Sequence, residues 1–223
     1  MAKPKKTQFR APPKKCVYCG QAVDHTRDHV PPRSLFMEPL PQGLIAVPAC
    51  AACNGGFSQL DTAFKEWLGF ALGVSDADRN RYWNEKLLPT VRNNQKRRRE
   101  IVDGLYPVRV RVPNQVAPVE LHALNIDADI QERMIIRLVR GLWFKEFRQI
   151  LPAEVPISQM RLDSPKGMEE FTQRCKWRHL ENQFSYGVGT DREHEWTSCW
   201  FFLFHGGNFS MAYTGDAAKL IDE

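Results

Sequence analysis

The chain has 223 residues, of which 43% are hydrophobic and 26% charged. This length accommodates one substantial domain, or a small module beside a larger one. No apolar run is long enough to cross a membrane, and the first residues, Met-Ala-Lys-Pro-Lys-Lys, lack the apolar core of a secretory signal. We therefore expect a cytoplasmic protein, in which paired cysteines bind zinc rather than form disulfides.

The net charge of +5 is modest but unevenly distributed. Residues 1–15 contain prolines and no acidic residue, and their basic residues are Lys3, Lys5, Lys6, Arg10, Lys14 and Lys15. This composition predicts a disordered basic tail, which would bind polyanions through counterion release and without sequence preference.

Two Cys-x-x-Cys pairs follow the tail. Cys16 and Cys19 form the first pair, Cys50 and Cys53 the second. Two such pairs separated by about thirty residues match the spacing of a tetrahedral four-sulfur zinc site. Gly20 suits the left-handed turn that closes such a zinc knuckle. The cysteines therefore predict a structural zinc.

The segment between the pairs contains Asp28 and His29, and Asn54 directly follows Cys53. Phosphodiester hydrolysis needs a base to deprotonate water and a cation to neutralise developing negative charge. Asp28 and Asn54 offer hard oxygen ligands that suit Mg²⁺ or Mn²⁺, and His29 is a candidate base because its ordinary pKa is about 6.5. Neighbouring residues of an extended chain point to opposite sides, so we expect Asp28 and His29 to have different roles.

These residues resemble the zinc-stapled branch of the HNH endonucleases. The resemblance rests on Cys16-Val-Tyr-Cys-Gly20, Arg27-Asp-His-Val-Pro-Pro-Arg-Ser-Leu35 and Val47-Pro-Ala-Cys-Ala-Ala-Cys-Asn54, and covers about residues 16–75. It implies a ββα-metal module of the treble-clef type, with His29 as general base and Asp28 and Asn54 as ligands of one divalent cation. The family's middle Asn is missing, because Gly43 stands in its place, which puts the rigidity of the loop and the rate in doubt.

Other residues of this region have weaker assignments. Arg27 and Arg33 are candidates for phosphate contact or ordinary surface charge, and Asp24 and His25 are interpreted as solvated loop residues. After Asn54, a helical repeat of apolar residues comprises Leu60, Phe64, Trp67, Leu68 and Ala71. A helix N-terminus beside the cation would favour phosphate, and the glycines at 55 and 56 indicate either close backbone approach or a loose turn.

Residues 76–223 contain no second catalytic motif. Helices are predicted at about 76–86 and 90–103, the latter carrying Arg92, Lys96, Arg97, Arg98 and Arg99 as a solvated face or a nucleic-acid contact. Residues 106–112 alternate as in a half-buried strand, and residues 119–123 could pair with them. A longer helix is predicted at about 128–150, with Ile130, Met134, Leu138 and Leu142 facing inward. Its Arg133, Arg137 and Arg140 would lie on a polar face that could contact DNA.

Near the end, residues 200–205 and 209–213 predict two strands joined by a tight turn, the first buried on both faces. Their aromatic side chains fit a protein core better than base stacking. Cys175 and Cys199 belong to no motif and are interpreted as buried or idle thiols.

Together these patterns predict an α+β protein with a basic tail (1–15), a zinc-stapled nuclease module (16–75) and a C-terminal α+β domain (76–223). The expected function is metal-dependent cleavage of nucleic acid, above all double-stranded DNA. The alternative is a zinc-dependent nucleic-acid-binding module without cleavage. A third possibility is that the C-terminal domain is the functional centre, as a protein-interaction or ligand-sensing domain that switches the nuclease on. This domain could also form a homodimer or bind a protein partner.

Overall fold

The computed structural model describes residues 15–22, 26–72, 77–111, 117–124, 129–160, 172–173, 175–190 and 194–215. Most of the predicted basic tail, Asp24 and His25 lie outside these ranges. Within them the fold is mixed helix and sheet, as the sequence predicts. None of the described helices is long and apolar enough to cross a membrane.

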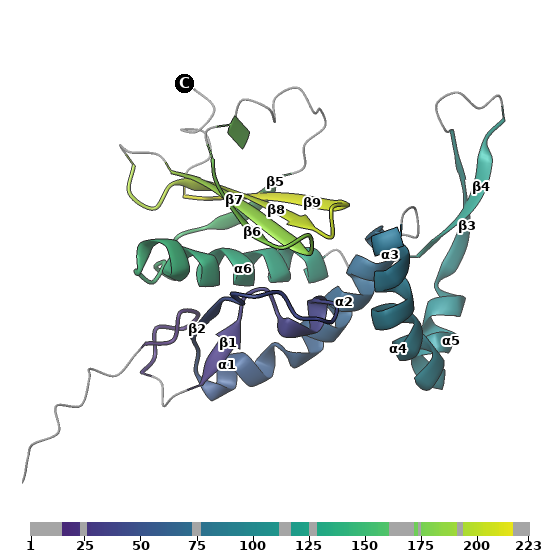
Figure 1. The fold of residues 1–223 in the computed structure, drawn as a ribbon, viewed down its shortest axis with the longest axis horizontal. Helices are drawn as coiled ribbons and strands as arrows, with labels where there is room; N and C mark the ends of the chain where they lie inside the picture. The colour runs from purple at the N-terminus through teal and green to yellow at the C-terminus, as the bar shows by residue number, and fades with distance from the viewer. Residues whose placement is uncertain are drawn as a thin grey trace, which may run out of the picture.

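The four cysteines lie at one end of the molecule. Strand β1 (Arg27–His29) pairs antiparallel with β2 (Ala46–Pro48), and the 3-10 turn η1 (Arg33–Leu35) lies between them in sequence. Two helices follow, α1 (Ala51–Gly56) and α2 (Ser58–Leu72). The cysteine-rich segment therefore folds as two short strands followed by a helix (Figure 1).

Helix α1 begins earlier than the sequence suggests. Cys50 is its N-cap, and Asn54 lies inside the helix rather than before it. The expected helix N-terminus is thus at the cysteine cluster, because the sulfur of Cys50 accepts a hydrogen bond from the N–H of Cys53. The glycines at 55 and 56 complete the helix and do not form a loose turn. Helix α2 buries Leu60, Phe64 and Leu68 as predicted.

A group of short elements extends from the far end of α2 (Figure 1). Its members are α3 (Ala77–Tyr82), the π-helix η2 (Trp83–Leu87), α4 (Leu88–Asn93), α5 (Gln95–Asp103), β3 (Leu105–Val110) and β4 (Val119–Leu124). The predicted helices and the pairing of β3 with β4 are confirmed. Strand β3 is nevertheless almost wholly exposed, not half-buried, because it pairs only with β4 and the ribbon projects away from the body.

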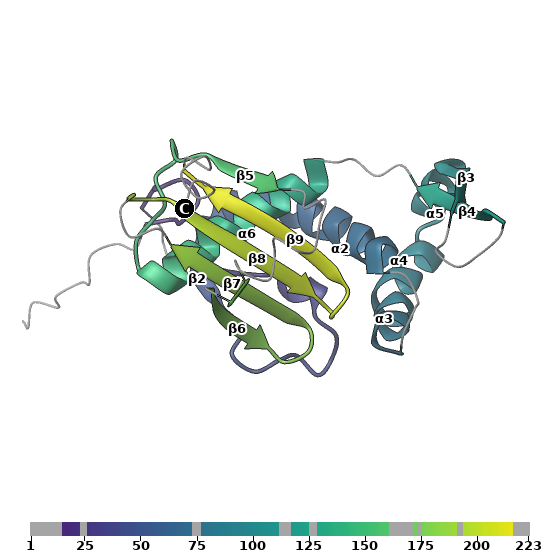
Figure 2. The ribbon, with the colours of Figure 1, turned by 90° about the horizontal axis from the view of Figure 1, so that it is seen from above.

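The rest of the molecule is a helix packed on a sheet. Helix α6 (Asp129–Phe147) covers one face of a five-stranded antiparallel sheet in the order β5-β9-β8-β7-β6 (Figures 1 and 2). The strands are β5 (Ile157–Met160), β6 (Lys176–Leu180), β7 (Phe184–Thr190), β8 (Ser198–Phe204) and β9 (Asn208–Thr214). The β8–β9 hairpin and the burial of β8 on both faces are confirmed. Strands β5, β6 and β7 were not anticipated.

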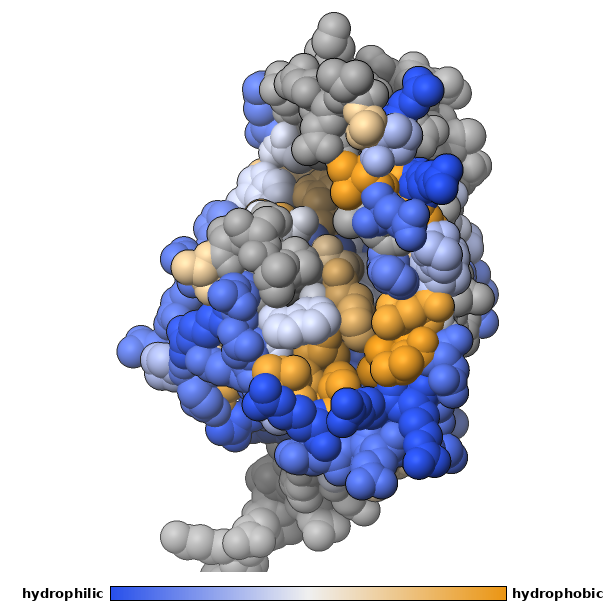
Figure 3. Space-filling model, turned by 90° about the vertical axis from the view of Figure 1, so that its right-hand side faces the viewer, coloured by the Kyte–Doolittle hydropathy of each residue, from blue (hydrophilic) through white to orange (hydrophobic). Residues whose placement is uncertain are grey.

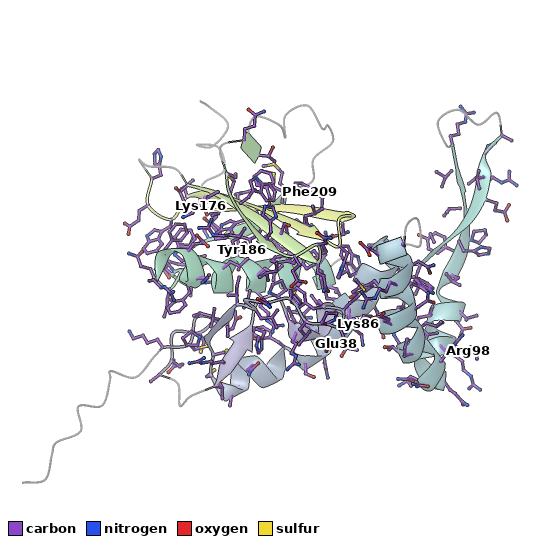
Figure 4. The ribbon with its side chains drawn as sticks, in the orientation of Figure 1. Glu38, Lys86, Arg98, Lys176, Tyr186 and Phe209 are labelled. Carbon is purple, nitrogen blue, oxygen red and sulfur yellow. The ribbon has the colours of Figure 1, made fainter. Side chains whose placement is uncertain are left out.

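One hydrophobic core joins these parts. It contains Val30 beside β1, Phe64 of α2, Leu138 of α6 and Phe202 of β8. In Figure 4, Tyr186 lies between the sheet and α6, where its hydroxyl donates to Glu146 Oε1 at 2.8 Å. The core therefore contains side chains from both the predicted module (16–75) and the predicted C-terminal domain (76–223).

Candidate functional site

The four cysteines Cys16, Cys19, Cys50 and Cys53 form a compact cluster. Their sulfur atoms all lie within 4.8 Å of one another, and the Sγ atoms of Cys19 and Cys50 are 3.7 Å apart. A tetrahedral zinc with Zn–S bonds of about 2.3 Å separates its sulfurs by about 3.8 Å. Within the described residues this is the group of acidic, His or Cys side chains suited to holding a metal ion, and its donor set fits a structural zinc.

The pKa values of the cysteines also favour a bound cation. The backbone N–H of Cys53 donates to the sulfur of Cys50 and lowers the pKa of Cys50 to about 7. Burial and the neighbouring sulfurs raise the pKa of Cys53 instead. One thiolate thus forms readily, while a second is opposed by its neighbours until a cation neutralises them.

Asn54 lies beside β1 as a consequence of the cluster. Its side-chain nitrogen donates to the backbone oxygen of Arg27 at 3.3 Å. Because Cys53 precedes Asn54, the cysteine cluster holds the first turns of α1 against the strand that carries Asp28 and His29. Along this strand Arg27 is exposed, Asp28 buried and His29 partly exposed, so Asp28 and His29 alternate as predicted.

Asp28 is bound within the protein rather than open to solvent. Its side chain is 5% exposed. Arg137 of α6 donates two hydrogen bonds to it, from Nη2 to Oδ1 at 2.6 Å and from Nε to Oδ2 at 3.0 Å. The hydroxyl of Tyr18 also donates to Oδ2, at 2.5 Å. Burial, followed by the charge of Asp28, raises the pKa of Tyr18, so the tyrosine stays a donor.

Arg137 is itself enclosed. Its side chain is 2% exposed, its guanidinium lies 4.2 Å above the ring of Phe57, and its Nη1 donates to Asp61 of α2. Burial alone would lower the pKa of Arg137, but its bonds to the two carboxylates outweigh this and raise it. Desolvation raises the pKa of Asp61 despite the neighbouring guanidinium. Arg137 is therefore a permanent cation shared by two carboxylates.

This placement corrects the sequence interpretation of α6. Arg137 is not part of a DNA-facing polar surface, and Arg140 donates to the backbone oxygens of residues 151, 152 and 153. Only Arg133 of the three arginines is exposed. A helical wheel cannot reveal this, because the carboxylates that bind Arg137 come from segments more than seventy residues away in sequence.

The remaining predicted contact residues are mostly at the surface. Arg27 and Arg33 are exposed, as are Lys96, Arg98 and Arg99 of α5. In Figure 4, Arg98 points outward from α5. Arg97 differs, because it binds the buried Glu66 of α2 and also Glu100.

Gly43, which stands where the resemblance to HNH endonucleases predicts an Asn, occupies an exposed turn with a φ of +77°. Glycine and asparagine are the residues that best tolerate this left-handed conformation. A Cβ at this position would meet no atom within 4 Å. Glycine therefore suits this turn.

Sequence reasoning did not identify Tyr18, Phe57, Asp61 or Arg137 as part of the site. Tyr18 lies inside the first Cys-x-x-Cys pair, and Asp61 lies seven residues after Asn54, so proximity in sequence was a weak signal for both. No local signal marks Arg137. Comparisons of the chain with protein-family models, curated proteins and solved structures found no significant match.

Proposed function

We propose that this protein is a zinc-stapled HNH-type endonuclease that hydrolyses phosphodiester bonds of nucleic acid, with duplex DNA as the preferred substrate class. The observation that supports this most directly is the hydrogen bond between Asn54 and Arg27. It places Asn54, which follows the last cysteine of the cluster, against the strand bearing Asp28 and His29. The order β1, β2, α1 agrees with the ββα-metal topology that the sequence resemblance implies.

In this proposal His29 is the general base. Its imidazole takes a proton from a water molecule, the water oxygen bonds to phosphorus, and the bond from phosphorus to the leaving O3′ breaks. The leaving oxygen takes up a proton, and the products carry 5′-phosphate and 3′-hydroxyl ends. His29 suits the role because it is partly exposed and lies on the strand face opposite Asp28.

The expected catalytic cation does not fit the described arrangement of its predicted ligands. Both oxygens of Asp28 accept hydrogen bonds from Arg137, and the side chain is almost fully buried. The same observation favours a second candidate function, a zinc-dependent nucleic-acid-binding module that does not cleave.

Nucleic acid as the ligand is supported by the distribution of charge. Residues 92–111 contain seven basic and two acidic residues, so this stretch alone has a net charge of +5. Exposed Lys96, Arg98 and Arg99 lie on α5, on the side of the molecule away from the five-stranded sheet (Figure 1). Seen from that end, hydrophilic residues form the lower edge of the molecule (Figure 3).

A plasmid-nicking assay tests the proposal. Zinc-loaded protein is incubated with supercoiled DNA and Mg²⁺ or Mn²⁺, with EDTA added to half of the samples. We expect His29→Ala to keep its zinc and its DNA affinity and to lose cleavage by roughly 10² to 10⁴ in rate. His122→Ala is the matched control, because His122 is an exposed histidine of β4.

Undiminished cleavage by His29→Ala would contradict the assigned base. If the wild-type protein binds DNA tightly but nicks it with neither cation, the binding module without cleavage is the correct function.

A further inference from the structure

The Asp28–Arg137 pair links the candidate site to the rest of the fold. A carboxylate has about four positions at which it can accept a hydrogen bond or a metal ion. Arg137 and Tyr18 together occupy three of these on Asp28. Mg²⁺ also retains several water molecules when it binds a protein carboxylate, and a side chain that is 5% exposed leaves little space for them.

We infer that Arg137 is a positioning residue that acts as an internal cation: it occupies Asp28 and excludes divalent cations until the guanidinium moves away. This inference rests on the proposed function, because it concerns the same carboxylate. Two positive groups on one carboxylate repel each other, and a guanidinium cannot relieve this repulsion by losing its proton. Occupation of Asp28 by Arg137 and by a divalent cation are therefore competing states.

Asp61 is a second carboxylate partner for the guanidinium of Arg137. It binds Nη1 of the same guanidinium, and its side chain is 26% exposed, compared with 5% for Asp28. The ring of Phe57 supports the guanidinium from one face. Arg137 can thus release Asp28 and remain paired with Asp61, so it need not become a buried unpaired charge.

The packing of α6 keeps Arg137 beside Asp28. Residues 137 and 141 lie one turn apart on the same face of α6, and residues 28 and 30 lie on the same side of the extended chain at β1. A Cβ at Gly141 would come within 2.6 Å of the side chain of Val30. The helix is therefore packed closely against the chain at β1, which holds the backbone of Arg137 beside Asp28.

Binding of Mn²⁺ tests the competition without relying on activity. Free Mn²⁺ is titrated by electron paramagnetic resonance into zinc-loaded wild type, Arg137→Gln, Asp28→Asn and the double variant. We expect Arg137→Gln to bind one Mn²⁺ on the order of tenfold or more tightly than wild type. The double variant should lose this gain. Asp28→Asn alone should bind Mn²⁺ as the wild type does. If Arg137 had only a structural role, its replacement would not create a Mn²⁺ site.

Zinc content and circular dichroism show whether each variant folds. If Arg137→Gln does not fold, wild type and Asp28→Asn still decide the question, because wild-type Mn²⁺ binding that depends on Asp28 would overturn the inference. Equal Asp28-dependent binding in wild type and Arg137→Gln would overturn it as well.

Cleavage measured in the same samples separates the two proposals. A new Mn²⁺ site in Arg137→Gln without cleavage would support the inference and contradict the nuclease function. Cleavage by wild-type protein with Mn²⁺ bound at Asp28 would support the nuclease function and contradict the inference.

Discussion

Asp28 shows how the same residue can fit a sequence motif and still have an additional partner in the fold. Its position before His29 and between two cysteine pairs suggests a cation ligand. In the structure a bidentate guanidinium holds it, which is the strongest geometry for a charged hydrogen-bonded pair. Replacing one partner of such a buried pair costs about 3–5 kcal/mol, because the other charge stays buried and unpaired. The pair therefore contributes to stability as well as to the site.

His205 makes the stability of the fold dependent on pH. It lies in the β8–β9 turn, is 5% exposed, and donates from Nε2 to the backbone oxygen of Leu35 at 3.1 Å. Its Nδ1 has no hydrogen-bond partner among the described residues. Burial lowers the pKa of His205 to about 4. A histidine of the unfolded chain has a pKa near 6.5. Between about pH 6.5 and pH 4 the unfolded chain therefore binds a proton at His205, whereas the folded protein does not.

We expect the free energy of unfolding to fall as the pH is lowered from about 6.5 to about 4, with His205 contributing roughly 3 kcal/mol to the fall. Urea titrations at several pH values between 4 and 7.5 measure it. His205→Phe should flatten this part of the pH profile, whatever its effect at pH 7.5. Loss of zinc at low pH affects both proteins alike, so identical slopes would show that His205 does not titrate in this range.

At the scale of elements, the contact between α6 and the chain at β1 depends on the absence of a side chain at Gly141. A Cβ at Gly141 would approach three atoms of the buried Val30 at 2.6, 3.0 and 3.2 Å. One of these atoms is the Cβ of Val30, which no rotation of the side chain can move away. Glycine at this helical position is therefore a packing requirement, although alanine is intrinsically the better helix former.

Gly141→Ala should destabilise the protein by up to about 2 kcal/mol, since overpacking costs about 1–3 kcal/mol and the higher helix propensity of alanine offsets only about 1 kcal/mol of this. Gly56→Ala is the control: position 56 is helical and a Cβ there meets nothing within 4 Å, so a small gain is expected. Thermal unfolding of both variants and of Gly141→Ala/Val30→Ala provides the measurement. If Gly141→Ala costs as much in the Val30→Ala background as in the wild type, the strain lies elsewhere.

At the scale of the whole molecule, α2 connects two regions that could contact one ligand. Its fifteen residues span about 22 Å, and Glu66 lies eight residues, or about 12 Å, after its first residue Ser58. Arg97 anchors α5 to α2 through the buried Glu66. The exposed basic residues of α5 are thus held at a defined distance from Asn54.

Replacing Lys96, Arg98 and Arg99 with alanine should weaken binding to a 30-base-pair duplex. The slope of log affinity against log salt should fall by up to about 0.9 for each phosphate that the variant no longer neutralises. The control replaces three exposed basic residues of α6 and β6, namely Arg133, Lys145 and Lys176. Equal reductions in affinity in the two triple variants, measured by fluorescence anisotropy, would show a general charge effect.

The sequence alone determined the local features of this protein. The cysteine spacing predicted a cluster that forms, and helical and alternating periodicities predicted α2, α6, the β3–β4 pairing and the β8–β9 hairpin. These features depend on residues close in sequence or on short repeating patterns, so they can be recognised without the fold. The nuclease chemistry of Asp28, His29 and Asn54 stays a prediction.

Only the tertiary structure decided how these parts meet. Nothing in the local pattern of α6 distinguishes Arg137 from Arg133, yet one is buried between two carboxylates and the other is exposed. Strands β5, β6 and β7 owe their places to partners far along the chain. A buried charge is tolerated only where distant segments supply its partners, and a strand only where a neighbour accepts its hydrogen bonds. Both conditions are properties of the assembled chain, which is why no segment taken alone reveals them.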